Sequence, residues 1–141
     1  MNLSLLLNGF EETRTLSYIN AHDVKNPLLL QIHSTESKVG KQALRDMQKE
    51  IWELMRLPDN IEEIDGKKNL KVELLNKLGI DYLCKHVESW DGLVDEKGKK
   101  VKFDRELLKQ AIENNHDLGV AIEKFSKDIE GNFQKTQGKA L

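Results

Sequence analysis

Residues 28–37 read LLLQIHSTES, and along this stretch the spacing of the apolar residues changes from that of a strand to that of a helix. The run 28–32 is short and apolar, and it follows an Asn-Pro breaker. Ser34 or Thr35 then offers a side chain that can cap a helix, and apolar residues recur at helical spacing downstream. This change of period predicts an α+β fold.

Upstream of this stretch, residues 2–32 are predicted to be β-rich. Apolar runs at 3–7 and 15–19 precede the run at 28–32, and the Asn-Gly pair at 8–9 is a typical turn dipeptide. Pro27 is expected at the start of its strand, where it removes no hydrogen-bond donor from the ladder. The sequence therefore predicts a small N-terminal β element, arranged as a meander or a hairpin.

Downstream, four helices are predicted to dominate the chain. The first is expected to end at Pro58, and the polar residues 58–68 are expected to form a loop. Gly79 can break or bend the second helix, because glycine inside a helix costs roughly 1 kcal/mol relative to alanine. Asp104 and Asp117 can cap the third and fourth helices. The apolar positions of these helices are Leu44, Met47, Ile51, Leu54, Met55, Leu74, Leu75, Leu78, Leu83, Val87, Leu107, Leu108, Ala111, Ile112, Leu118, Ala121, Ile122, Phe125 and Ile129.

Between the second and third helices, residues 87–103 are predicted to form a short β-hairpin. Trp90 precedes an acidic turn at 95–98, and Phe103 follows that turn with the alternation of a strand. We expect Trp90 and Phe103 to pack against each other, and Phe103 to contact Leu108 as a hydrophobic staple. The predicted fold is thus α+β: a mainly helical single domain with a small N-terminal β element and a short β-hairpin near 87–103.

The chain of 141 residues suits one domain, expected over 1–133, with the polar residues 134–141 as a flexible tail. Its 22 basic and 24 acidic residues give a formal net charge of -2, without the basic excess of most nucleic-acid-binding proteins. The apolar run at the N-terminus is too short for a signal peptide or a membrane span. We therefore expect a cytoplasmic protein that binds neither nucleic acid nor a membrane.

Residues that could carry chemistry are few and scattered. The only cysteine, Cys84, stands in an apolar stretch and is expected to be a buried small side chain. His22, His33, His86 and His116 fall in four different segments, and none has the spacing of a metal-ligand pair. No nucleophile elbow or glycine-rich phosphate loop is present. We expect no catalytic residue, no metal and no cofactor, and hence no enzyme.

The segment 90–103, WDGLVDEKGKKVKF, combines small motifs that are similar to those of bacteriophage tail assembly chaperones of the siphophage type. The shared features are a Trp-acid-Gly step, an apolar pair, an acidic turn ending in glycine, a step to phenylalanine and an acidic helix start. In this chain they are Trp90-Asp91-Gly92, Leu93-Val94, 95–98, 101–103 and 104–108, with Gly131-Asn132-Phe133 downstream and 28–37 upstream. The likeness covers about residues 22–133, and the charged stretch 65–71 has no counterpart in it.

This resemblance implies a protein of the host cytoplasm that is absent from the mature virion. Such a chaperone binds the tape measure protein, keeps it soluble and recruits tail tube subunits, and it self-associates along its partner. Our candidates for partner binding are the aromatic residues Trp90, Phe103, Phe125 and Phe133. Two alternatives remain: another small phage structural protein, such as a head-tail connector or tail completion protein, and a DNA-binding regulator.

Overall fold

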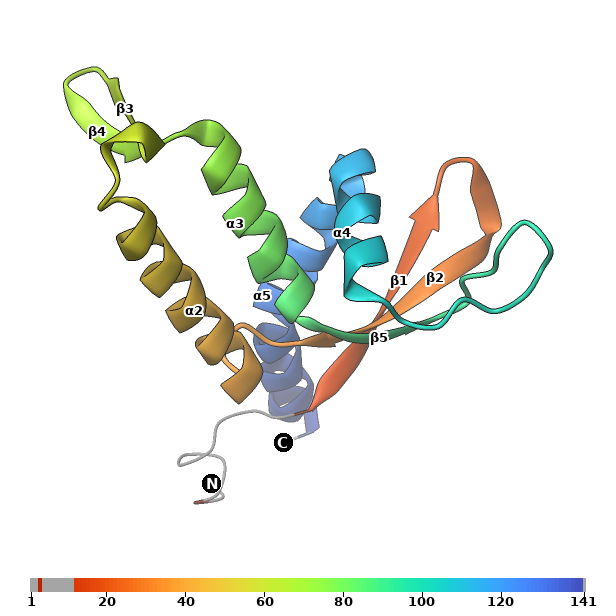
Figure 1. Cartoon of the computed structure of the whole chain (residues 1–141). Helices are drawn as coiled ribbons and strands as arrows, with labels where there is room; N and C mark the ends of the chain where they lie inside the picture. Colours follow the sequence, from red (N-terminus) through yellow and green to blue (C-terminus); the bar gives the residue numbers. More distant parts are fainter. Residues whose placement is uncertain (1–2, 4–11, 141) are drawn as a thin grey trace.

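The computed structural model describes Leu3 and residues 12–140, and beyond residue 128 it describes the backbone alone. The elements are β1 (Thr13–Asn20), β2 (Asp23–His33), α2 (Lys38–Leu54), the 3-10 helix η1 (Pro58–Asn60), β3 (Ile61–Ile64), β4 (Lys67–Leu70), α3 (Val72–Lys85), β5 (Val87–Asp91), α4 (Arg105–Asn114) and α5 (His116–Ala140). They form two parts (Figure 1). The body contains β1, β2, β5, α4, α5 and the end of α3. The arm, residues 38–79, contains α2, β3, β4 and the start of α3.

The centre of the body is an antiparallel sheet in which β2 lies between β1 and β5. Leu30 and Ile32 of β2 are fully buried on one face. Gln31 lies on the other face, where its amide donates a hydrogen bond of 2.9 Å to Thr15 Oγ1. This alternation suits a sheet with one face packed on a core and one face solvated.

An irregularity in β5 keeps its two large apolar residues on the packed face. Val87 is paired with Ile32 and Trp90 with Leu30, although Val87 and Trp90 are three residues apart. In a regular strand an odd spacing would place them on opposite faces. The register shift at Glu88 inserts one extra residue and removes this conflict.

Helices α4 and α5 and the end of α3 cover the packed face of the sheet. Two hydrogen bonds fix α5 to the rest of the body: Tyr18 Oη donates to Asp117 Oδ2 over 2.9 Å, and the Thr35 backbone N–H donates to Ser126 O over 3.1 Å. The buried core consists of Leu30, Ile32, Cys84, Val87, Leu108, Ile112, Leu118 and Ile122.

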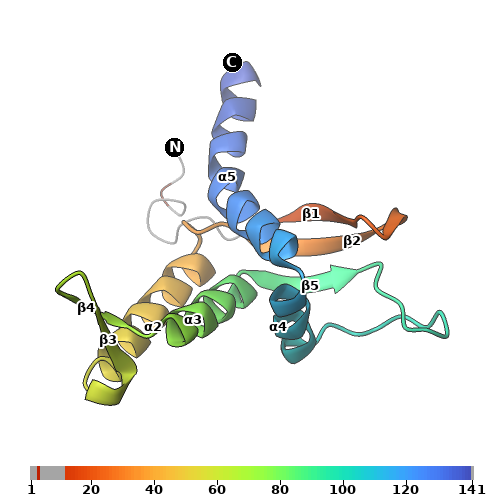
Figure 2. The ribbon, with the colours of Figure 1, turned by 90° about the horizontal axis from the view of Figure 1, so that it is seen from above.

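The arm leaves the sheet after β2 and returns at β5. The His33 backbone N–H donates to His86 O over 2.8 Å, so the two ends of the segment between β2 and β5 lie next to each other. Helices α2 and α3 run antiparallel and lie side by side, with α4 on the other side of α3 (Figures 1 and 2). The ribbon β3–β4 joins the helices through Asp65 and Gly66, both of which have positive φ, as a two-residue hairpin turn of type I′ requires.

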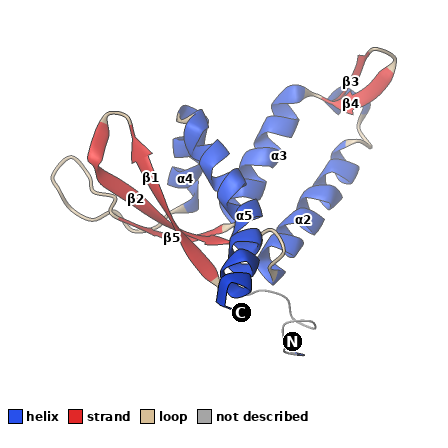
Figure 3. Ribbon diagram, turned by 180° about the vertical axis from the view of Figure 1, so that it is seen from behind, coloured by secondary structure: helices blue, strands red, loops and turns tan. Residues whose placement is uncertain are grey.

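The prediction of a mainly helical domain with only a small N-terminal β element and a hairpin at 87–103 is wrong. The described residues contain five strands in two sheets, and the larger sheet organises the body (Figure 3). β5 pairs with β2 rather than with residues 101–103, and the segment after β5 has one isolated bridge, between Val94 and Lys100. The reason is packing: β5 buries Val87 against the core, which a solvated local hairpin could not do.

Several local predictions also need correction. The expected loop 58–68 contains η1, β3 and the start of β4. The cap of α2 is Ser37, whose side chain accepts from the Gly40 N–H over 3.0 Å, and not Ser34 or Thr35. Asp117 lies inside α5 and accepts from Tyr18, so it is not a cap.

Pro27 lies within β2 rather than at its start, beside the register shift in β1, where a missing donor is tolerated. The strands expected at 15–19 and 28–32 are confirmed as parts of β1 and β2. The cap at Asp104 is confirmed as well, because its carboxylate accepts from the N–H groups of Glu106 and Leu107. The run 3–7 lies outside the described residues except for Leu3. The α5 backbone extends to Ala140, across most of the segment expected as a tail.

Candidate partner-binding surfaces

Three of the four aromatic residues proposed for partner binding pack against the body core. The Trp90 and Phe103 rings meet with centroids 4.9 Å apart, which confirms the expected pair, and Phe125 contacts the same core from α5. Trp90 Nε1 also donates a hydrogen bond of 2.8 Å to Val101 O. The structure thus brings Trp90 and Phe103 together, and both rings pack against the body core. The side chain of Phe133 lies outside the described residues.

Several large exposed apolar side chains lie instead on the arm. Trp52, near the end of α2, is 63% exposed, and the Arg56 guanidinium stacks 4.1 Å from the centre of its ring. Three more apolar residues surround the far end of the arm: Leu57 after α2, Ile64 in β3 and Val72 at the start of α3. They are 60%, 49% and 55% exposed, and we call these three residues the arm-tip patch.

The sequence pattern does not single out these residues as a surface. Trp52 stands outside the apolar stripe of its helix, and a large aromatic residue off the stripe is itself a signal of exposure. Leu57 lies between α2 and η1, Ile64 in β3 and Val72 in α3, and only the folded arm brings them to one end. No spacing in the sequence could have connected them.

An apolar groove of about 730 Å³ lies between α3, α4 and α5. Its walls include Leu75 and Ile80 of α3, Ile112 of α4 and Val120 of α5. Gly79 also lines it, and a Cβ atom added there would have no other heavy atom within 4 Å. Lys77, Glu113 and Glu123 also line it, and Lys127 Nζ lies 2.9 Å from Glu123 Oε1. We call it the helix groove.

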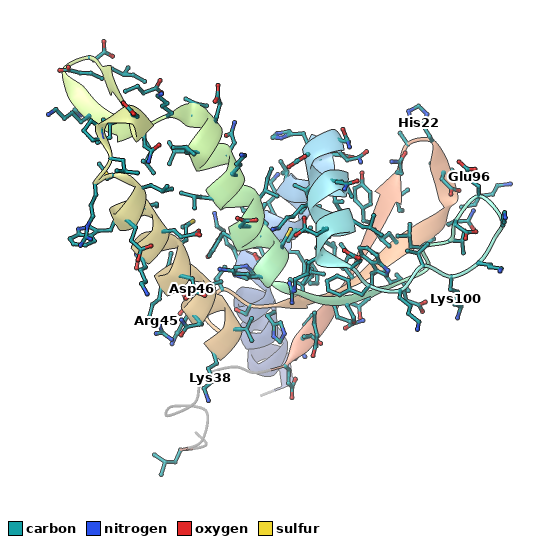
Figure 4. The ribbon with its side chains drawn as sticks, viewed as in Figure 1. His22, Lys38, Arg45, Asp46, Glu96 and Lys100 are labelled. Carbon is teal, nitrogen blue, oxygen red and sulfur yellow. The ribbon has the colours of Figure 1, made fainter. Side chains whose placement is uncertain are left out.

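A second groove, of about 630 Å³, is basic and lies where the start of α2 approaches α3 and α4. Lys38 and Arg45 contribute to it from α2, beside Asp46 (Figure 4). Lys85 Nζ lies 3.5 Å from Asp46 Oδ2, and Arg105 donates to Cys84 O over 2.6 Å. Arg45 also donates to Gln42 Oε1 over 3.0 Å, so three of the four cations in this groove are already engaged by the protein.

Burial shifts the pKa values of two core side chains, Cys84 and His86. Burial raises the pKa of the Cys84 thiol to about 11, so the nucleophilic thiolate is scarce. Burial lowers the pKa of His86, whose Nδ1 lies 2.8 Å from Tyr82 O. Within the described part of the chain, no three His, Cys, Asp or Glu side chains are placed to share a metal ion. Among the described helices, none has the length and apolarity needed to cross a bilayer.

Comparisons with curated proteins and with solved structures find no match to this chain. A family model described as YdaY prophage protein matches residues 35–141. The matched region starts just before α2 and includes the arm, β5, α4 and α5. It spans well over half of the sequence, so the chain belongs to the YdaY prophage protein family.

Proposed function

We propose that this prophage protein is a tail assembly chaperone without catalytic activity. It binds the tape measure protein, keeps it soluble in the host cytoplasm and recruits tail tube subunits, and it is absent from the finished virion. The membership in a prophage family supports the phage context, and the motif resemblance at 90–103 supports the role in tail assembly.

The arm-tip patch is the observation that carries this proposal. Leu57, Ile64 and Val72 are exposed at the end of a helical hairpin that stands away from the body core (Figure 1). Exposed apolar residues on a rigid element suit the capture of apolar stripes on a long helical partner. A chaperone needs such a surface and needs no nucleophile, base or metal.

Co-expression with the tape measure protein of the same prophage tests the proposal. The chaperone is expected to raise the soluble yield of that partner and to co-purify with it at more than one copy per partner chain. The triple variant Leu57→Ser, Ile64→Ser, Val72→Ser should lose both effects and remain folded, because none of the three residues belongs to the buried core.

The matched control is Ile19→Ser with Val24→Ser, which removes exposed apolar side chains of similar size from the β1–β2 end of the sheet. This control should preserve co-purification. A partner that stays insoluble, with nothing co-purifying, would reject the chaperone function and favour a connector or tail completion protein.

The basic groove favours a second candidate, a DNA-binding regulator. Lys38, Arg45, Lys85 and Arg105 line this groove together with one carboxylate, Asp46, and phosphate contacts provide most nonspecific affinity for DNA. Salt-dependent retention on DNA that is lost in Lys38→Gln with Arg45→Gln would support this candidate. Absence of retention at low salt would remove it.

A further inference from the structure

One line of residues along α2 combines basic side chains with an exposed tryptophan and contains no acid. Its members recur at steps of three or four residues, which place side chains on one face of a helix. All of them are exposed, and we call this set the basic stripe: Lys38, Lys41, Arg45, Lys49, Trp52 and, in the turn after the helix, Arg56. The opposite face, with Ala43 and Ile51, is buried or half-buried, so the stripe lies on the side of α2 that faces away from the packed side chains.

The cations of the stripe are available to a partner. Among the residues that the structure describes, Lys38, Lys41 and Lys49 form no ion pair. Arg45 donates only to a neutral group, the amide oxygen of Gln42. The acid nearest to the stripe in sequence position is Glu53, one turn beyond Lys49. The formal net charge of -2 therefore conceals a local excess of positive charge along α2.

Trp52 adds an aromatic surface in the middle of these charges. Its side chain is 63% exposed, and the Arg56 guanidinium lies 4.1 Å from the centre of its ring. Single-stranded nucleic acid offers both phosphates for the cations and unpaired bases that stack on such a ring. A duplex keeps its bases stacked inside, and an acidic peptide gives the indole no role. A bilayer would need the apolar face of α2, which is packed within the protein.

We infer that α2 binds single-stranded nucleic acid, with phosphates along the cations of the basic stripe and one base stacked on Trp52. An α-helix rises about 1.5 Å per residue, so the stripe is roughly 27 Å long and holds on the order of four nucleotides, as the smallest single-strand sites do. This activity goes beyond the chaperone function. It also differs from that of a DNA-binding regulator, in which the phosphates of a duplex occupy the basic groove.

Fluorescence anisotropy of a labelled oligothymidine of about 20 nucleotides, measured with the full chain at several salt concentrations, tests the inference. Each neutralised phosphate contributes roughly -0.7 to the slope of log affinity against log salt, so the wild type should show a slope of about -3. Lys41→Gln with Arg45→Gln and Lys49→Gln should reduce that slope by about 2. Trp52→Ser should weaken binding about tenfold and leave the slope unchanged, whereas Trp52→Phe should retain most of the affinity. Glu53→Gln should strengthen binding, because it removes the acid beside the stripe.

The matched control removes the same charge elsewhere. Lys97→Gln with Lys99→Gln and Lys100→Gln changes three exposed lysines of the loop after β5, and it should bind within about twofold of the wild type because distant exposed charges are screened. All substituted residues are exposed, and thermal melts should show that every variant remains folded.

The inference is overturned if the wild type does not bind the oligonucleotide at low salt, if both triple variants lose affinity equally, or if Trp52→Ser binds like the wild type. A duplex that binds as tightly as the single strand overturns it in favour of the regulator. Polyglutamate that displaces the oligonucleotide at equal charge overturns it in favour of an acidic protein partner.

The tape measure co-expression separates this result from the proposed function, because the stripe variants leave the arm-tip patch intact. A chain that solubilises its partner but binds no oligonucleotide rejects only the activity of the stripe. A chain that binds the oligonucleotide but no tape measure protein rejects only the chaperone function.

Discussion

The Trp90 indole meets the Phe103 ring edge to face, with an interplanar angle of 79° and ring centroids 4.9 Å apart. Trp90 belongs to β5 and Phe103 immediately precedes the cap of α4, so this contact joins the last strand of the sheet to the helix that covers it. The indole N–H donates to Val101 O and holds the intervening chain beneath the ring. The loop 92–104 is thus closed at its base by one side chain.

Trp90→Ala should reduce the free energy of unfolding by about 3 kcal/mol, the lower end of the cost for a large aromatic residue, because the ring is only half-buried. Trp90→Phe keeps an aromatic contact but loses the hydrogen bond to Val101, and should cost about 1 kcal/mol. Urea denaturation measures both changes. Equal midpoints for Trp90→Ala and the wild type would show that the ring pair does not stabilise the fold.

Alanine substitution at two helical glycines should change the stability of the fold in opposite directions. A Cβ atom at Gly40 would lie 2.3 Å from Ser34 O, so Gly40→Ala must push α2 away from the backbone before it and should cost about 3 kcal/mol. Gly79→Ala meets open space and should stabilise α3 by roughly 0.5–1 kcal/mol. Thermal melts of the two variants provide the comparison, and a shift in the same direction for both would contradict it.

Stability should fall as the pH drops below about 7, because His86 is buried and its pKa lies below the ordinary value of 6.5. Well above pH 6.5 both the folded and the unfolded chain hold His86 neutral, and its contribution is fully present. As the pH falls below 6.5, the unfolded chain takes up a proton that the folded chain resists, which favours unfolding. Urea titrations between about pH 5 and 7.5 should show this loss.

The matched test of the pH effect compares two histidines. His86→Asn removes the buried imidazole and should flatten the dependence over this range, even if its stability at neutral pH is lower. His116→Asn changes an exposed residue at the start of α5 and should leave the dependence as in the wild type. An unaltered pH profile in His86→Asn would assign the effect to other groups.

Cys84 should resist thiol reagents while the chain is folded. Its side chain is buried, and its pKa of about 11 leaves little thiolate at about pH 8. Labelling by iodoacetamide should therefore be slow in buffer and rapid in denaturant, as read by mass spectrometry. Rapid labelling of the native protein would mean that the end of α3 opens frequently from the sheet.

The strands at 15–19 and 28–32 and the cap at Asp104 were predictable from the sequence, whereas the caps expected at Ser34 or Thr35 and at Asp117 were wrong and the ribbon β3–β4 was not recognised. Its strands are short and mostly exposed, so they lack the alternating apolar pattern by which half-buried strands are found. The available signals were the Asp65-Gly66 dipeptide, typical of a tight hairpin turn, and the cross-strand charge pair Glu63 and Lys68.

The partner of β5 could not be predicted, because strand pairing across a long separation leaves no local pattern. Val87 and Trp90 favour a strand, and the nearby acidic turn favours a local hairpin, yet the pairing is with Leu30 and Ile32. The candidate surfaces could not be predicted from the sequence for the same reason. The arm-tip patch combines Leu57, between α2 and η1, with one residue each of β3 and α3. The helix groove combines residues of α3, α4 and α5, so only the folded chain brings either set together.

The arm is inserted in the sequence between β2 and β5, which pair in the sheet, and this insertion affects folding during synthesis. β1 and β2 can pair as soon as their short turn closes, but β5 reaches β2 only after residues 34–86 have been synthesised and folded back. Forming the α2–α3 hairpin lowers the entropic cost of that closure, because it brings His33 and His86 together. Until then the second edge of β2 remains open to strands of other chains. The folding speed of the helical hairpin therefore sets how long a nascent chain is exposed to aggregation.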